Sequence, residues 1–254
     1  MAKQAAGSNR LFVNQYNVSG NVSALSSIEA RRDLIDLTDI TQTGHDRKGG
    51  LSDGSMVVNG WWDGTPAQTP PAVHDVFKTA GGLVDAVVTY WTGITAGVPV
   101  ACLVADQANY TPVRSPDASL AWTVSAEASA GAGLEWGHAL TTANQTFAST
   151  GYGSDCDDLA GAPTSTAFGA ILYVHLISIA SGNITISAVH GAAAAPTTAV
   201  TGCTTSLLTT AGAYRIASTS PTFNLLRYTR LYATGTFSNA VIAAALIRPI
   251  GPQA

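Results

Sequence analysis

Charged side chains are scarce in this chain. Asp, Glu, Lys and Arg make up 11% of the 254 residues, against roughly 25% in an ordinary globular domain. Lysine is absent after Lys78, and the densest basic points are the pairs Arg31-Arg32 and Arg47-Lys48. A protein that grips nucleic acid needs clustered Lys and Arg to displace counterions from phosphates. With a formal net charge of −4, the chain is not expected to bind DNA tightly.

Recognisable motifs for catalysis are also lacking. The cysteines Cys102, Cys156 and Cys203 are far apart, and no CxxC or Cys/His spacing indicates a metal site. No histidine accompanies a serine or cysteine in a motif such as G-x-S-x-G, and no glycine-rich stretch has the Lys-Ser/Thr of a phosphate-binding loop. Glu127 and Glu135 could pair as glycosidase carboxylates, but the chain has few glutamates from which to build such a site. We therefore expect neither an enzyme nor a bound cofactor.

One acidic cluster, Asp155, Asp157 and Asp158, lies in a glycine-rich stretch. Calcium needs about six to eight oxygen ligands, and the cluster lacks the glycine and the distal Glu of a calcium loop. We interpret it as a solvated turn and expect no metal.

Long apolar runs are missing too. The longest nearly pure run is Ala240–Ile247, far short of the roughly 20 residues that cross a membrane as a helix. The N-terminus has no apolar signal core. The sequence therefore predicts no membrane segment and gives no indication of secretion.

Small residues make up for the missing charge. A free monomer usually stays soluble by displaying charge, so a weakly charged surface is easier to explain if much of it faces other subunits. The alternative is a β-rich protein that is simply neutral. We favour assembly.

Short alternating segments predict an all-β protein with one short helix. We expect a flexible arm at residues 1–10, a β domain at 11–147, a linker or loop at 148–168 and a second β-sandwich at 169–254, of jelly-roll or immunoglobulin-like type. The helix begins after Thr69-Pro70-Pro71, since Val73, Val76, Phe77 and Ala80 recur at helical spacing. Gly81-Gly82 ends it.

Residues 28–53 are harder to interpret. Ser26 and Glu29 fit a capping box, which would start a helix, but we expect a strand over Ile28–Thr38. Gly44–Asp53 holds three glycines and no apolar residue before Leu51, so it predicts a mobile loop. A strand around Met56–Val58 follows.

The C-terminal part shows two turn signals. Ser181-Gly182-Asn183 separates the apolar runs Ile171–Ile179 and Ile184–Val189, which predicts a β-hairpin. In the same way, Thr234–Asn239 is expected to turn the chain between Arg227–Tyr232 and Ala240–Arg248.

Trp61 and Trp62 form the sharpest aromatic pair. Adjacent residues of a strand point to opposite faces, so at most one of these rings is expected in the core. The other is a possible surface aromatic, either in a subunit interface or stacked on a sugar.

The order of these features resembles the tail tube proteins of long-tailed bacteriophages. The resemblance covers roughly residues 8–145 and is strongest in "NVSGNVSALSSI" and "DLTDITQTGHDRKGGLSDGSMVVNGWW". Beyond residue 165 the chain resembles the β-rich C-terminal domains that decorate such tubes, above all in "RYTRLYATGTFSNAVIAAALIR". The minimal tube subunit lacks this second domain.

The resemblance implies a virion protein assembled in the host cytoplasm. In that family, hexameric rings stack into a hollow tube around a tape-measure protein, meet tail terminator or baseplate proteins, and later let DNA pass. A long loop of each subunit contacts the next ring. That role would fall to these residues: Gly44, His45, Asp46, Arg47, Lys48, Gly49 and Gly50.

A different function stays open beside this one. The protein would then decorate the capsid or be a minor tail protein, and its C-terminal sandwich would bind a host glycan. A hydrolase has no constellation of residues behind it.

Overall fold

The fold is almost entirely β-strand. A computed structural model describes residues 8–41, 43–65, 72–79, 82–114, 119–157, 165–220 and 222–249. Within these ranges there is one α-helix, α1 (Val73–Phe77), and it is five residues long. The predicted all-β class with a short helix is confirmed, although Ala80 and Gly81 lie outside the described residues. Among the described residues, no helix is long and apolar enough to cross a membrane.

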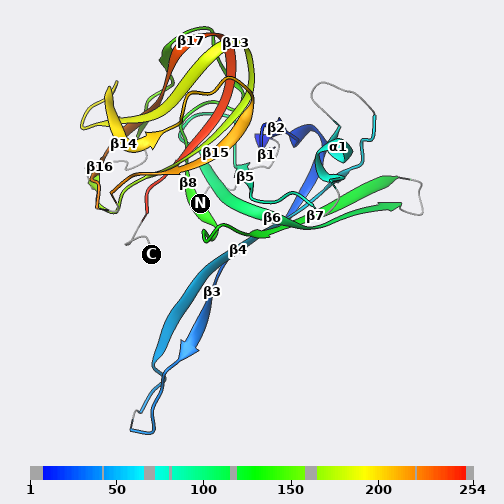
Figure 1. The fold of residues 1–254 in the computed structure, drawn as a ribbon. Coiled ribbons are helices and arrows are strands. Elements are labelled where there is room, and N and C mark those ends of the chain that lie inside the picture. Colours follow the sequence, from blue (N-terminus) through cyan, green and yellow to red (C-terminus); the bar gives the residue numbers. More distant parts are fainter. Residues whose placement is uncertain are drawn as a thin grey trace. The chain divides into compact units, whose positions relative to one another are not determined.

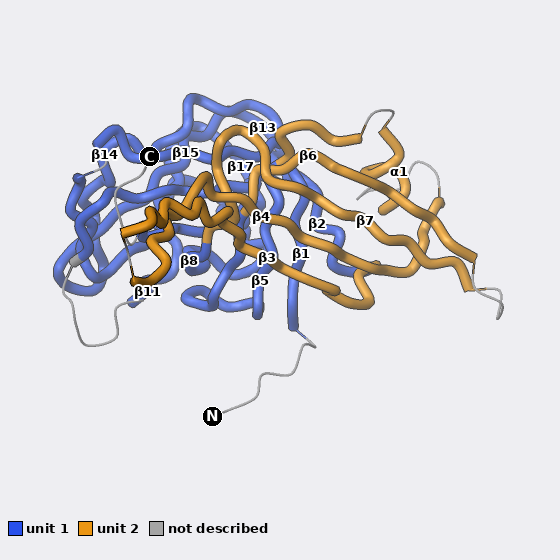
Figure 2. Tube along the Cα trace, turned by 90° about the horizontal axis from the view of Figure 1, so that it is seen from below, with its two compact units in different colours: residues 1–20, 87–102, 136–254 blue, residues 21–86, 103–135 orange. Residues whose placement is uncertain are grey.

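The chain forms two compact units (Figure 2). Unit 1 consists of residues 1–20, 87–102 and 136–254, and unit 2 consists of residues 21–86 and 103–135. The backbone therefore passes between the units four times. A boundary at 148–168 was predicted instead, and the pairing of that segment explains the difference. Gly151–Tyr152 (β10) and Cys156–Asp157 (β11) both pair with the last strand of the chain.

Unit 2 contains α1 and a sheet of long strands. Strands β3 (Val22–Asp36) and β4 (Arg47–Trp61) pair as a hairpin. Strand β4 also pairs with β7 (Leu120–Ala128), and β7 pairs with β6 (Pro99–Arg114) from Ala105 onward. Met56, Phe77 and Trp122 are buried, and the ring of Phe77 on α1 lies 5.5 Å from that of Trp122 on β7. The strand expected over Ile28–Thr38 is confirmed as part of β3, so the capping-box signal does not start a helix here.

Unit 1 contains the remaining strands. They are β1 (Arg10–Val13), β2 (Tyr16–Asn17), β5 (Ala86–Trp91), β8 (Glu135–Ala139), β9 (Gln145–Phe147), β10, β11, β12 (Ser165–Thr166), β13 (Ile171–Gly191), β14 (Thr198–Thr204), β15 (Gly212–Ala217), β16 (Leu225–Leu226) and β17 (Tyr228–Ile247); a 3-10 turn, η2 (Ser19–Asn21), follows β2. Strands β1 and β2 form a small hairpin that pairs with β5.

The centre of unit 1 is the antiparallel pair β13–β17 (Figure 1). Both strands are about 20 residues long and stay paired from Ile171↔Ile247 to Gly191↔Tyr228. The two turns predicted at 181–183 and 234–239 are therefore wrong: these segments lie opposite each other within the continuous pair. Their residues are exposed or half-buried, whereas most residues toward the ends of both strands are buried. The turn signals mark the place where the paired strands bend.

The bend folds both halves of β13 onto one core. Leu172, Val174 and Leu176 from the first half share a hydrophobic cluster with Ile184 and Ile186 from the second. Strand β17 contributes residues from both of its halves in the same way, such as Leu231 and Ile242. Unit 1 is thus a two-layered sandwich built largely from one folded strand pair.

The outer face of the first half of β13 is buried as well. His175 is fully buried, stacks on Phe12 at 5.4 Å between ring centroids, and has Thr89 Oγ1 2.9 Å from its Nε2. Its Nδ1 donates to the carbonyl of Asn14 at 2.5 Å. Loss of solvation lowers the pKa of His175 to about 4, against the opposing effect of the Asn14 hydrogen bond. The imidazole is therefore neutral at pH 7 and anchors the N-terminal hairpin to the sandwich.

Candidate assembly interface

Beyond Gly54, no third strand lies beside the β3–β4 hairpin among the residues that the structure describes. Strand β4 pairs with β7 only over Ser55–Trp61, whereas its pairing with β3 continues outward to Asp36↔Arg47. Figure 1 shows this part as a long two-stranded extension. We call Arg31–Asp53 the outer ribbon. An isolated two-stranded hairpin is marginal in water, so the outer ribbon is a segment that would gain stability from a partner.

The outer ribbon contains the predicted contact residues. Gly44, His45 and Asp46 lie at its tip, but Arg47–Gly50 belong to β4. The predicted loop at Gly44–Asp53 is therefore wrong from Arg47 onward. The glycines do not mark a loop there. They lie where the register of the β3–β4 pair shifts, between Arg32 and Leu34.

The glycines accommodate this irregularity. A Cβ on Gly50 would lie 3.1 Å from the backbone oxygen of Asp33, and one on Gly49 would lie 3.6 Å from the side chain of Arg32. The small residues thus allow close strand contact and let an arginine side chain lie across the ribbon. They do not break the strand.

Hydrogen bonds close the tip of the ribbon. Leu37 N donates to the carbonyl of Asp46 at 2.8 Å, and Asp46 N donates to Thr38 Oγ1 at 2.9 Å. The hydroxyl and backbone N–H of Thr38 both bind the carboxylate of Asp36, which lowers the pKa of Asp36 below its ordinary value. His45 Nδ1 lies 3.1 Å from the same carboxylate. His45 and Asp46 therefore contribute to the conformation of the tip.

A charged cluster lies at the base of the ribbon. Arg31 is 3.0 Å from Glu127 on β7, 3.3 Å from Asp53 and 3.9 Å from Glu29. All four side chains are about half exposed, so each pair contributes only about 0–1 kcal/mol. The cluster links the ribbon to the body of unit 2, and with three carboxylates to one guanidinium it is net negative.

Apolar side chains are exposed along the ribbon. Their relative accessibilities run from 47% to 103%. They are Leu34, Ile35, Leu37, Ile40 and Leu51. Fully burying such a side chain contributes about 1.5–3 kcal/mol, so exposed residues clustered on one hairpin form a credible contact surface. The sequence prediction centred on the polar residues and missed Leu34 and Ile35, because apolar residues in a predicted strand suggest a core.

The two adjacent tryptophans differ in environment. Trp61, at the end of β4, is 58% exposed. Trp62 is half-buried, and its ring lies 5.3 Å from that of His74 on α1. His74 is in turn within hydrogen-bonding distance of the Tyr110 hydroxyl, at 3.1 Å. Trp62 thus belongs to an aromatic cluster of unit 2, whereas Trp61 faces solvent.

The acidic residues predicted to form a turn have arginine partners. Arg227 binds the carboxylate of Asp157 through two hydrogen bonds, of 2.8 and 2.5 Å, which raises the pKa of Arg227. Asp155 is 3.6 Å from Arg230 and accepts from the Ala195 N–H at 2.7 Å. Asp158 lies outside the described residues. No group of three potential metal ligands occurs in the part of the chain that the structure describes.

Among solved structures, the chain has distant neighbours. No family model matches the chain, and no curated protein matches it. A crystal structure of SPP1 Dit (gp 19.1), described as a paradigm of the hub adsorption apparatus in phages infecting Gram-positive bacteria, aligns with 94% of this chain and 99% of its own. The TM-score is 0.34 and the sequence identity 8%. Values this low do not show a shared fold.

Proposed function

We propose that the protein is a structural subunit of a bacteriophage tail and that its outer ribbon binds the next copy. The observation that carries the proposal is the group of exposed apolar side chains on the outer ribbon, which pairs with no third strand among the described residues. The sequence resemblance to tail tube proteins over residues 8–145 supplies the tail assignment.

Two properties of the ribbon suit self-assembly. Over the outer ribbon each strand has one neighbour in the described structure, so backbone N–H and C=O groups are left along its edges. Such edges pair readily with another chain. Burial of Leu34, Ile35 and Leu51 would add a hydrophobic contribution that the half-exposed ion pairs cannot supply. Repetition of one contact around a ring would multiply a modest energy per subunit.

The more specific proposal is the tail tube itself. In that case the copies form hexameric rings, the rings enclose a tape-measure protein, the ends meet tail terminator or baseplate proteins, and DNA only passes through. The low content of charged residues, 11%, suits a surface that is largely covered in the virion.

Electron microscopy of the purified full-length protein at increasing concentration tests the proposal. We expect rings or stacked tubes that form without added metal and are unaffected by EDTA. The rival function, a decorating or minor tail protein that binds a glycan, predicts monodisperse monomers. A protein that stays monomeric at the highest concentration would overturn self-assembly through the ribbon.

A further inference from the structure

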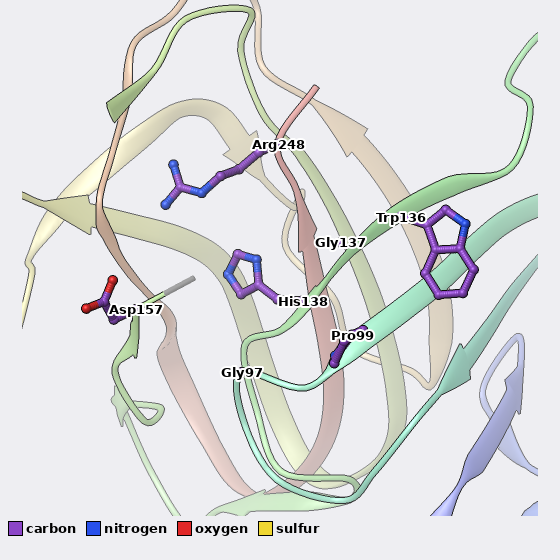
Figure 3. Close-up of a pocket in the computed structure, with 7 residues that line it drawn as sticks. All are labelled: Gly97, Pro99, Trp136, Gly137, His138, Asp157 and Arg248. Atoms are coloured by element: carbon purple, nitrogen blue, oxygen red, sulfur yellow. The ribbon is translucent and has the colours of Figure 1, made fainter. Parts of the chain in front are cut away.

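Unit 1 has an open pocket of about 390 Å³ (Figure 3), but its charged side chains already have partners. Arg227 donates two hydrogen bonds to the carboxylate of Asp157. The guanidinium of Arg248 donates to the carbonyls of Leu225, Leu226 and Arg227 at 2.8–3.1 Å. The sheet of unit 2 differs from this pocket, because one of its faces presents exposed apolar side chains.

This face of the unit 2 sheet carries three rows of uncharged side chains. Residues paired across antiparallel strands lie on the same face, and so do alternate residues of one strand. The pairs Trp61↔Ala121 and Ala121↔Val113 therefore place these side chains in one row across β4, β7 and β6. The next two rows hold Asn59, Thr123 and Thr111, then Val57, Ser125 and Asn109. We call these nine residues the sheet face.

The sheet face lies on the outer side of the sheet. Val58, Trp122 and Val124 alternate with it along β4 and β7 and are buried, so the core of unit 2 is on the other side. Trp61 is 58% exposed and Val113 is 50% exposed. Contiguous exposed apolar surface is typical of an interaction site.

The polar side chains of the sheet face are hydrogen-bonded within the sheet. Thr123 Oγ1 donates to Asn59 Oδ1 at 2.8 Å, and Asn59 Nδ2 donates to Ser26 Oγ at 2.6 Å. Asn109 Oδ1 accepts from Ser125 N at 2.9 Å. A polar group that already has a hydrogen bond costs less to cover than one that loses its bond to water. The sheet face is therefore suited to burial under a partner.

Toward the base of the outer ribbon, the same side of the sheet becomes acidic. Glu127 follows Ser125 by two residues on β7 and is directly paired with Asp106 on β6. Like charges opposite each other destabilise a sheet. Arg31 lies 3.0 Å from Glu127, but Asp106 is exposed and has no ion pair among the described residues. A cation supplied by another subunit would relieve this repulsion.

The outer ribbon carries matching groups. Ile35 and Lys48 are directly paired, so they share one side of the ribbon, and both are exposed. Arg31 lies 3.0 Å and Arg47 3.9 Å from a carboxylate, whereas Lys48 forms no ion pair within the described ranges. Ile40, near the tip, is fully exposed. The ribbon thus offers a cation and apolar side chains.

The two surfaces are similar in length. Glu127 and Ala121 are six residues apart on β7, which corresponds to about 20 Å. Ile35 and Ile40 are five residues apart and span at most about 17 Å. A ribbon whose strands begin beside the acidic residues can therefore bring its tip close to the row that contains Trp61.

We propose that the sheet face is the docking site for the outer ribbon of the next copy. Lys48 of the ribbon pairs with Asp106, and Ile40 packs against Trp61 and Val113. The inference rests on the proposed function, since it names the surface that the ribbon meets. Each copy offers its ribbon to one neighbour and its sheet face to another, and such a head-to-tail contact can close into a ring.

Mixing two variants tests the docking site. The ribbon variant is Ile35→Thr, Ile40→Thr, and the face variant is Trp61→Ser, Val113→Thr. Each should be folded by circular dichroism and monomeric in sedimentation velocity, because each lacks one half of the contact. At concentrations well above those at which wild type forms rings, the mixture should form a one-to-one dimer. In that dimer the intact ribbon of the face variant meets the intact sheet face of the ribbon variant.

Charge reversal tests the ion pair. Lys48→Glu and Asp106→Lys should each raise the concentration at which rings form by about fivefold or more, because repulsion replaces attraction. The double variant Lys48→Glu, Asp106→Lys should assemble at nearly the wild-type concentration, as a direct contact requires. A double variant no better than the single ones would contradict this pairing.

Val84→Thr is the matched control, since Val84 on unit 2 is 71% exposed and lies outside the sheet face. It should assemble as wild type does. If the face variant also forms rings, or the mixture contains no heterodimer, the ribbon binds another surface and only this inference fails. If the wild-type protein forms no rings, or the ribbon variant still forms them, the proposed function itself fails.

Discussion

Gly182 on β13 and Gly235 on β17 lie diagonally opposite each other at the bend of this strand pair. Each glycine lies against the residue that follows the other glycine in the sequence. A Cβ on Gly182 would overlap the carbonyl oxygen of Thr236, and a Cβ on Gly235 would overlap that of Asn183. Both glycines have positive φ, 89° and 138°. The bend therefore needs glycine at two places for two reasons, close backbone approach and a backbone conformation that other residues rarely adopt.

Replacing Gly182 with alanine should strongly destabilise unit 1. We expect Gly182→Ala to lower the free energy of unfolding by roughly 3 kcal/mol or more, because steric overlap adds to the cost of positive φ. Chemical denaturation gives the measurement. Gly97→Ala is the control: Gly97 has a similar φ of 85° with nothing within 4 Å of its Cβ position. That variant should lose only about 1 kcal/mol. Equal losses would show that space at the bend is not limiting.

Removing apolar surface from the ribbon should abolish assembly without unfolding the subunit. In the double variant Leu34→Thr, Ile35→Thr, threonine removes apolar surface and has a β-branched shape that suits a strand. We expect a shift from rings to monomers in sedimentation velocity, with the melting temperature unchanged. Leu207→Thr is the control, since Leu207 in unit 1 is 62% exposed and Leu34 is 64% exposed. If the double variant and the control assemble alike, the ribbon is not the interface.

Stability should fall as the pH drops from about 6.5 to about 4, in part through His175. The unfolded chain binds a proton at this histidine in that window, whereas burial lowers the folded pKa to about 4. Protonation of His175 therefore lowers the free energy of unfolding, by up to about 3 kcal/mol at the acid end of this range. Burial and the nearby Arg248 charge lower the pKa of His190 as well, so His190 adds to the effect in the same direction.

The variant His175→Gln isolates the His175 contribution. It should be less stable than wild type at pH 7, because the Thr89 and Asn14 contacts are disturbed. Its stability should depend less steeply on pH between about 4 and 6.5, as measured by thermal unfolding across that range. Parallel profiles for the variant and wild type would mean that His175 is not the titrating group.

The segment 165–254 should not fold alone. Leu140, Phe147 and Cys156, which precede it, lie in the same hydrophobic cluster as the β13–β17 core. Without them the segment would expose apolar surface. We expect the isolated segment to bind a hydrophobic dye and to unfold without a sharp transition. Residues 136–254, which include these side chains, should bind less dye and unfold more cooperatively. A cooperative transition for residues 165–254 would instead support the boundary predicted at 148–168.

Local pattern was enough to identify the class of fold and several elements. Alternating apolar residues predicted strands such as those at Ile28–Thr38 and Met56–Val58, and helical spacing at Val73, Val76 and Phe77 located α1. These signals are reliable because they depend only on which side chains face a core. The resemblance implied an inter-ring contact at Gly44–Gly50, and that contact stays a prediction. The loop conformation expected there was wrong from Arg47 onward, and the exposed apolar residues of the outer ribbon were not singled out.

The sequence determined that the chain is a weakly charged β protein with glycine at 182 and 235, and only the tertiary structure decided what those glycines do. A positive-φ glycine has the same local signature in a hairpin turn and in a bend of two paired strands. The pairing of Asn183 with Thr236, 53 residues away, distinguishes the two cases. The same holds for Leu34 and Ile35: their sequence shows that they are apolar, but whether a core covers them depends on strands far away in the chain.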